Sequence, residues 1–596
     1  MMSTIVSSTF GLILLISISG VRSDHHTLPG GLEPWELAIS EKLGEIEFNV
    51  TTRNDSAREH FMLGLKLLSC FWYDFAEKEF LIAQKIDPEM CLAYVGEALT
   101  KRMFLWNSDD IDAANVILAN MTSACSVESL SQREQDYVTA VQSLFNITKK
   151  NDGMARTTSF GDQMQEIHEE YRDAQAGSLR VLAWIETAGS NETKLQKSRE
   201  YIDEIFEANP NHPSVIHYAL HAYDFSTPGV AIRGLPYAEK YGDVVSYASH
   251  GNHMPAHIYI RLGMWKESVF TEKIALDAGD DFTDKYENSS LLYDKWNRYH
   301  SLEYLQYYLL QQGRFNEAKV LMERMRRVIS QAEVQGDALF WQHWYRMAAR
   351  QYLETRNFNL PNTHAIDLET PNWKPLDATE FWSPHSEVGF HLARGLQAIQ
   401  TKSSDSGTMI EGIFDRIRQI KFEMAPQDWP YLKKTVVFLT MQLNSTYEAS
   451  QGRIEEAVEI MKEAVVVQES MVFSGSDPTL LYVSTWEFLG DMILKYKLED
   501  HYDTAIEMYK KALLARPRRA ASVYGLYKLY KRKRLDSEMN SQLEEIRKIW
   551  SDPDTDFEAR EEIEKSDDGT SGQYSIHSSL NIFIVLLCAL KLISLF

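Results

Sequence analysis

Amphipathic helical segments separated by short, recurring turns run through most of this 596-residue chain. The turn Gly452-Arg453-Ile454 opens one such segment, and Gly313-Arg314-Phe315 opens an equivalent one. Few stretches alternate between apolar and polar residues as strands do. A single helical hairpin buries too little apolar surface to be stable alone, so hairpins of this kind stack into a continuous core. The pattern predicts an all-α fold, a right-handed helical solenoid.

The clearest repeat lies in residues 486–517. Trp486 to Gly490 marks a first helix, Tyr502 to Tyr509 a second, and Pro517 the end of the hairpin. This is the spacing of a tetratricopeptide repeat of about 34 residues. We therefore expect tetratricopeptide-like helix-turn-helix repeats over one ectodomain, residues 24–550.

Histidines recur at matching positions of three successive predicted hairpins. A spacing of four residues places two histidines on one face of a helix, and this spacing occurs twice. If the hairpins stack, these faces become neighbours. The candidate metal or groove ligands are His217, His221, His253, His257 and His300. We expect His250 and His343 to be surface or packing residues, because neither extends the spacing.

Neutral imidazoles beside a carboxylate suit zinc or copper, so these are the candidate cofactors. Asp224 and Glu303 are the candidate carboxylates, as ligands, as hydrogen-bond partners of a ligating histidine, or as bases for a metal-bound water. The alternative is a network in which the histidines bond to tyrosines such as Tyr218 and Tyr304 and line a peptide-binding groove. The residues alone slightly favour that alternative.

The N-terminus predicts a secretory signal peptide, residues 1–23. Residues 10–18 are a short apolar run, and Val21-Arg22-Ser23 supplies residues for cleavage before Asp24. A membrane anchor is the alternative, but a run of this length spans only about 14 Å as a helix, against roughly 30 Å for the hydrocarbon layer. We expect the mature chain to begin at Asp24.

The C-terminus predicts a glycosylphosphatidylinositol (GPI) attachment signal. Residues 551–581 are acidic and then rich in serine and glycine, and residues 582–596 are apolar except for Lys591. Asp568 and Gly569 are the expected attachment sites, and the tail from 582 is then removed. A transmembrane anchor is the alternative, but the tail would span only about 22 Å and would place Lys591 within the bilayer. We expect a lipid-anchored protein on the outer face of the cell.

Glycosylation sequons and cysteines agree with export. The Asn-x-Ser/Thr sequons are Asn49, Asn54, Asn120, Asn146, Asn191, Asn288 and Asn444. Cys588 lies in the removable tail, so Cys70, Cys91 and Cys125 remain. At most one disulfide forms among three cysteines, and one thiol is left over.

The chain has a formal net charge of −24, which argues against nucleic acid as a partner. It also lacks a phosphate-binding glycine loop, a Gly-x-Ser-x-Gly elbow and a His-Glu-x-x-His motif. Nucleotide-dependent, serine hydrolase and familiar zinc protease activities therefore have no support in the sequence.

The chain resembles a large, uncharacterised family of tetratricopeptide-repeat proteins. The most specific segments read His-x-x-x-His-Ala-Tyr-Asp, from His217, and His-Met-Pro-x-His, from His253; residues 93–100, 133–137 and 391–396 also carry the resemblance. It implies an α-helical repeat fold but no settled activity. One departure stands out, because the family pattern has a His-Pro pair before Leu-Trp where this chain has Met103-Phe104.

Two functions follow from the sequence. In the first, a GPI-anchored extracellular repeat protein binds a peptide or protein partner in its concave groove. In the second, a metal-dependent ectoenzyme uses the histidine cluster with zinc or copper. We favour the first, because repeat solenoids usually bind partners and Met103 breaks the family pattern.

Overall fold

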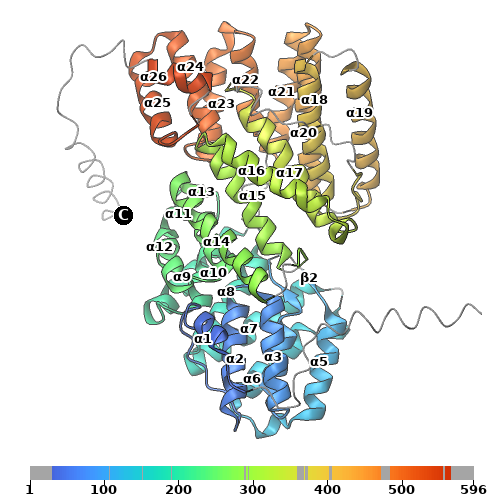
Figure 1. Cartoon of the computed structure of the whole chain (residues 1–596), viewed down its shortest axis with the longest axis vertical. Coiled ribbons are helices and arrows are strands. Elements are labelled where there is room, and N and C mark those ends of the chain that lie inside the picture. The colour runs from blue at the N-terminus through green and yellow to red at the C-terminus, as the bar shows by residue number, and fades with distance from the viewer. Residues whose placement is uncertain are drawn as a thin grey trace, which may run out of the picture. The chain divides into compact units, whose positions relative to one another are not determined.

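The computed structural model describes residues 30–565, apart from 106–107, 151, 190, 287–289, 293, 359–367, 369–373, 402–405, 428, 472–482 and 555–556. The predicted signal peptide, both expected GPI attachment residues, the apolar tail and the Asn288 sequon therefore lie outside the described residues. The described chain is helical except for one short hairpin of strands, and the prediction of an all-α solenoid is confirmed (Figure 1).

The chain divides into two compact units where the sequence predicted one ectodomain. Unit 1 comprises the described residues of Met1–Thr187 together with His212–Ser214, and unit 2 comprises those of Ala188–Asn211 and Val215–Phe596. The short segment at His212 belongs to unit 1 because Ser214 donates a hydrogen bond to the Ser69 hydroxyl, at 2.7 Å.

Unit 1 contains helices α1 to α8 and the strand hairpin, whose register pairs Arg102 with Asp109. Its elements are α1 (Pro34–Ser40), α2 (Asp55–Ser69), α3 (Tyr73–Ile86), α4 (Cys91–Leu99), β1 (Arg102–Met103), β2 (Ser108–Asp109), α5 (Ile111–Ala124), α6 (Gln132–Leu144), α7 (Gly153–Tyr171) and α8 (Ala174–Ala188), which ends at the boundary. A disulfide joins Cys91 to Cys125, and Cys70 keeps its thiol, fully buried. The expectation of one disulfide and one remaining thiol is confirmed.

Unit 2 is a longer stack of helical hairpins. Its helices are α9 (Glu192–Ala208), α10 (Pro213–Tyr223), α11 (Val230–Arg233), α12 (Leu235–Val244), α13 (Ser249–Leu262), α14 (Trp265–Tyr286), α15 (Lys295–Gln311), α16 (Phe315–Ile329), α17 (Ala338–Thr355), α18 (Ser383–Thr401), α19 (Ser406–Glu423), α20 (Pro430–Ser450), α21 (Ile454–Glu469), α22 (Thr485–Lys495), α23 (Tyr502–Ala515), α24 (Ala520–Lys533), α25 (Asp536–Ile549) and α26 (Glu558–Lys565). Helix α26 lies within the predicted stalk, where Phe557 and Ile563 are buried, so the folded unit extends beyond residue 550.

The two ends of the α13–α26 stack meet. Figure 1 shows α24 to α26, in red, beside α15 and α16, in green. The Trp265 indole donates a hydrogen bond to the Arg518 carbonyl at 2.7 Å, and the Trp550 indole donates one to the Gln311 carbonyl at 3.1 Å. Residues more than two hundred positions apart in the sequence are therefore packed together, and the solenoid of unit 2 closes on itself.

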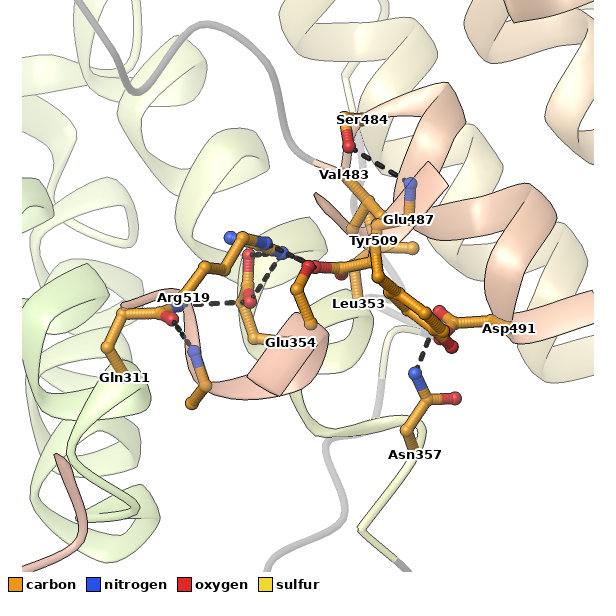
Figure 2. Close-up of polar contacts among 12 residues, drawn as sticks. Gln311, Leu353, Glu354, Asn357, Val483, Ser484, Glu487, Asp491, Tyr509 and Arg519 are labelled. Carbon is orange, nitrogen blue, oxygen red and sulfur yellow. Dashed lines mark hydrogen bonds and ion pairs between the residues drawn. The ribbon is translucent and has the colours of Figure 1, made fainter. Parts of the chain in front are cut away.

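Arg519 lies at this closure, with its side chain 2% exposed. Its guanidinium donates hydrogen bonds to the Glu354 carboxylate on α17 at 2.8 Å and to the Glu487 carboxylate on α22 at 2.6 Å (Figure 2). It donates another to the Tyr307 hydroxyl on α15 at 3.0 Å. The neighbouring carboxylates raise the pKa of Arg519 despite its burial. One cation therefore joins three helices to α24.

Glycines allow close helix packing against two buried aromatic rings. In unit 1, Gly64 and Gly96 lie against the Phe80 ring, and in unit 2 Gly490 and Gly525 lie against the Tyr509 ring. A Cβ atom at Gly525 would lie 2.3 Å from the Tyr509 ring, closer than any ordinary contact. The Tyr509 ring cannot move aside easily, because its hydroxyl donates a hydrogen bond to Asp491 at 2.6 Å.

We expect Gly525→Ala to lower the stability of unit 2. The added methyl group overlaps Tyr509, and such overpacking costs about 1 to 3 kcal/mol. The matched control is Gly412→Ala on α19, where nothing lies within 4 Å of the added atom. Higher helix propensity makes that control neutral or stabilising by up to about 1 kcal/mol. Urea unfolding of the three proteins measures both effects, and equal midpoints for Gly525→Ala and the parent would contradict the packing argument.

Candidate metal centre

Three helices of unit 2 bring six histidines together. His217 and His221 lie one turn apart on α10, and α15 contributes His300. On α13, positions 250, 253 and 257 follow one another at three and four residues, so the three rings project from one face of that helix. Helix periodicity thus places every imidazole toward the same interior region.

The six rings form two groups. In the first group, one ring nitrogen each of His217, His221 and His250 lie within 4.8 Å of one another. The second group comprises His253, His257 and His300, and one ring nitrogen of each likewise lies within 4.8 Å of the others. The groups are adjacent, because the ring centroids of His250 and His253 lie 5.6 Å apart and those of His221 and His257 6.1 Å apart.

These distances suit metal ligation. The Nε2 atoms of His217 and His221 are 3.2 Å apart, and those of His253 and His257 are 2.7 Å apart. In a tetrahedral zinc site, bonds of about 2.0 Å place two imidazole nitrogens about 3.3 Å apart. The first pair has this separation, whereas the second is as short as a hydrogen bond.

A hydrogen-bonded chain explains the short second pair. Asp224 is ion-paired with the Arg261 Nε at 2.7 Å, and it accepts a hydrogen bond from His257 Nδ1 at 2.7 Å. This leaves His257 Nε2 as an acceptor, so His253 Nε2 is the donor. The other nitrogen of His253, Nδ1, then accepts a hydrogen bond from the Glu272 carboxyl at 2.5 Å.

The pKa shifts agree with this assignment. Burial raises the pKa of Glu272 well above its usual value, which favours the protonated carboxyl. Burial, together with the neighbouring His257 and His300, lowers the pKa of His253 well below 6.5. Burial and neighbouring histidines also lower the pKa values of His221 and His250 well below 6.5. These imidazoles are neutral at physiological pH, which is the protonation state that binds metal.

The structure adds to the expectations for two residues. His250, expected to be a surface or packing residue, is 4% exposed and belongs to the first group. Its spacing indicated this position, because His250 is three residues before His253 and seven before His257. The Glu303 carboxylate accepts hydrogen bonds from His343 Nδ1 at 2.7 Å and from the Arg346 and Arg350 guanidinium groups. His343 is a buried packing residue, as expected.

Two further residues were missed by sequence reasoning. Glu272 lies on α14, the second helix of its hairpin, and no spacing rule connects it to His253. Arg261 lies one turn after His257 and fixes Asp224. Both Asp224 oxygens accept hydrogen bonds, one from His257 and one from Arg261, so Asp224 has the position of a hydrogen-bond partner that orients His257.

The histidines do not line an open surface. The exposed fractions of His217, His221, His250, His253 and His257 are 0 to 5%, and His300 is half-buried. Tyr304, which is fully buried, packs against the rings of His253 and His300 at centroid distances of 4.8 and 4.5 Å. In this structure, five of the six rings are therefore withdrawn from the surface.

A third group of potential ligands, in unit 1, is better explained as an ion pair. It comprises Glu36, His60 and Glu79. His60 Nδ1 lies 2.6 Å from the Glu79 carboxylate, and its Nε2 lies 3.3 Å from the Gly30 carbonyl oxygen. A carbonyl only accepts, so Nε2 donates to Gly30, and the imidazolium form would donate from both nitrogens. The pKa of His60 is raised although burial opposes the charge, because Glu79 and Glu36 favour the cation. The protonated ring would offer no lone pair to a metal.

The remaining sequence predictions concern the surface and the membrane. Among the described sequons, Asn49, Asn120 and Asn191 are exposed, whereas Asn54, Asn146 and Asn444 are half-buried. In the described part of the chain, no helix combines the length and the hydrophobicity needed to cross a bilayer.

Met103, which departs from the family pattern, lies on β1 in unit 1, whereas all six clustered histidines belong to unit 2.

Comparisons with known proteins are weak. No protein-family model and no curated protein matches the chain. Among solved structures, the APC/C hetero-tetramer Cut9–Hcn1 is 12% identical over 86% of this chain and 90% of that chain, with a TM-score of 0.27. The TPR domain of P58(IPK) is 12% identical over 83% and 98%, with a TM-score of 0.21, and Naa15/Naa10 bound to HypK-THB is 12% identical over 86% and 82%, with a TM-score of 0.17. Scores this low assign no function.

We expect the metal-free protein to lose stability as the pH falls below about 6.5. In that range the unfolded histidines bind protons that the buried ones do not, so the free energy of unfolding decreases toward acid pH. Each buried histidine contributes up to about 1.4 kcal/mol per pH unit. Replacing one of them, in His250→Asn, should make the dependence shallower. Urea unfolding of chelator-treated protein at several pH values between about 7.5 and 5.5 tests this, and identical slopes for both proteins would contradict it.

Proposed function

We propose that this chain is an extracellular metalloprotein that binds two metal ions in unit 2, one in each three-histidine group. The observation that carries the proposal is the convergence of six imidazoles, of which two have a carboxyl group on the nitrogen facing away from the cluster. Partners of this kind orient ligating histidines and raise their basicity. The group of Glu36, His60 and Glu79 in unit 1 contains a single imidazole and therefore lacks this convergence of histidines.

The donor set favours copper or zinc. Each group offers three imidazoles and no thiolate, which suits both ions, and the Irving–Williams order ranks copper(II) above zinc. Three protein ligands leave a coordination position open, as in catalytic sites. Because the cluster is buried, only a small molecule such as water or dioxygen would reach that position. Hydrolytic or oxidative chemistry is therefore the activity that the site supports.

Binding in the second group replaces a proton. In the metal-free chain, His253 Nε2 donates its proton to His257 Nε2, so a cation between these nitrogens must displace it. Glu272 then accepts a hydrogen bond from His253 Nδ1 as a carboxylate, which offsets part of the charge of the ion. Metal binding should release protons from the His253–Glu272 pair, and acid pH should oppose it.

The proposed location rests on the sequence. A signal peptide, sequons and a C-terminal GPI attachment signal support export and lipid anchoring, and the Cys91–Cys125 disulfide suits an oxidising compartment. Binding of a peptide or protein partner is the second function proposed for the helical repeats, but the burial of the histidines separates it from the metal centre.

Elemental analysis of the protein, purified without a polyhistidine tag and equilibrated with copper or zinc, tests the proposal. We expect two ions per parent chain. The double variants His217→Asn/His221→Asn and His253→Asn/His257→Asn should each retain one ion, because each removes most ligands of one group. The matched control is His343→Asn, since His343 is buried and carries a carboxylate on Nδ1 but belongs to neither group.

Three results would reject the two-ion proposal. The first is a parent chain without bound metal. The second is a single ion that is lost in both double variants, because the cluster would then be one mononuclear site. The third is equal loss in His343→Asn, which would indicate general disruption of unit 2. Circular dichroism of each variant shows whether it is folded.

A further inference from the structure

Unit 2 contains a cavity of about 680 Å³ that none of the predicted site residues lines. Its walls come from α17, α18, α20, α22 and α24 and from the residues directly after α17 and α22. Volumes of 300 to roughly 1,000 Å³ are typical of sites that bind small molecules. The cavity is therefore large enough for an organic ligand.

The charges on its walls are predominantly positive. Four cationic side chains and one carboxylate line the cavity: Arg356, Lys495, Lys528, Arg532 and Asp491. This balance runs against the composition of the chain, which has 85 acidic and 61 basic residues. Asp and Glu carboxylates outnumber basic groups in the whole chain, but only one carboxylate lines this cavity.

The single carboxylate is already occupied. Asp491 is ion-paired with Arg356, accepts a hydrogen bond from the Tyr509 hydroxyl at 2.6 Å and accepts another from the Asn357 amide at 2.8 Å. Figure 2 shows Asn357 and Tyr509 converging on this carboxylate beside the Arg519 network. Asp491 therefore neutralises Arg356 and does not neutralise the other three cations.

Those three cations have no carboxylate partner in the part of the chain that the structure describes. The Lys528 ammonium lies 4.3 Å from the centre of the Tyr524 ring, and the Lys495 ammonium 5.6 Å from that of Tyr496. The Arg532 guanidinium donates hydrogen bonds to the Leu494 carbonyl at 2.8 Å and the Tyr502 hydroxyl at 3.1 Å. These direct partners are neutral. The Asp491 carboxylate attracts Lys495, and the Asp491 and Glu562 carboxylates attract Lys528, but neither lysine forms an ion pair with them among the described residues.

The environment favours an incoming anion. Desolvation lowers the pKa values of Lys495 and Lys528. The effect matters most at Lys528, which is half-buried, because Lys495 and Arg532 are exposed to water. An anion beside the two lysines would reverse that penalty and raise both pKa values. Lys528 and Arg532 lie one turn apart on α24, so both side chains can reach one ligand.

We propose that this cavity binds a small organic oxyanion, a molecule carrying carboxylate or phosphate groups, through Lys495, Lys528 and Arg532. The remaining lining suits the organic part of such a ligand. Tyr352, Phe488 and Met492 offer apolar contacts, and the Asn357 and Gln400 side chains offer amide groups. This site is independent of the proposed metal centre, whose histidines do not line it.

Isothermal titration of the purified full chain at low salt, with citrate and with pyrophosphate as probes, tests the proposal. We expect saturable binding of at least one probe to one site per chain. The double variant Lys495→Gln/Lys528→Gln should weaken that binding by tenfold or more, because it removes two charge-assisted contacts. Binding should also weaken as salt is added.

The matched control is Lys531→Gln/Lys533→Gln. It removes the same number of positive charges, here both from α24, but these lysines do not line the cavity and are paired with Glu562 and Asp503. It should bind as the parent does. Preference for citrate identifies a carboxylate ligand, and preference for pyrophosphate a phosphate ligand. The proposal is overturned if neither probe binds the parent, if the cavity variant binds unchanged, or if the control loses binding equally.

Discussion

The buried guanidinium of Arg519 is the contact on which the closure of unit 2 depends. It joins α24 to carboxylates on α17 and α22 and to a hydroxyl on α15. Removal of one partner from a buried ion pair leaves an uncompensated charge and typically costs about 3 to 5 kcal/mol. Here the cation has two carboxylate partners. An open solenoid has only contacts between neighbouring repeats, whereas unit 2 also joins α15 and α17 to α24.

The closure has consequences for both sites of unit 2. Helix α15 provides Tyr307 to Arg519 and, two turns earlier, His300 to the second histidine group. Helix α17 provides Glu354 to Arg519 and ends beside Arg356 and Asn357 in the cavity wall. The same two helices therefore position the closure and one side of each site. Changes that loosen Arg519 should affect metal ligation and anion binding together, although neither ligand touches Arg519.

Local periodicity accounts for what the sequence predicted. The turns before Ile454 and Phe315 marked real helices, and the four-residue spacings of α10 and α13 brought their histidines onto shared faces. The same periodicity would have included His250, because a helix repeats at three and seven residues as well as at four. Glu272 and Arg519 could not be found in this way, because their partners belong to other helices. The ion pairs of Glu303 with Arg346 and Arg350, some forty residues later, could not be found in this way either.

The cationic side chains of unit 2 differ in whether a carboxylate is paired with them, and this difference distinguishes structural cations from candidate ligand-binding cations. Arg346, Arg350 and Arg519 are buried, and each is paired with a carboxylate that offsets the cost of its desolvation. Lys528 is half-buried, and its direct contact is with the Tyr524 ring, while the Asp491 and Glu562 carboxylates attract it without forming an ion pair among the described residues. A cation–aromatic contact is worth about 0.5 to 2 kcal/mol, less than a buried ion pair needs. The chain has an excess of carboxylates. A half-buried lysine without an ion-pair partner is therefore better explained by a bound ligand than by packing.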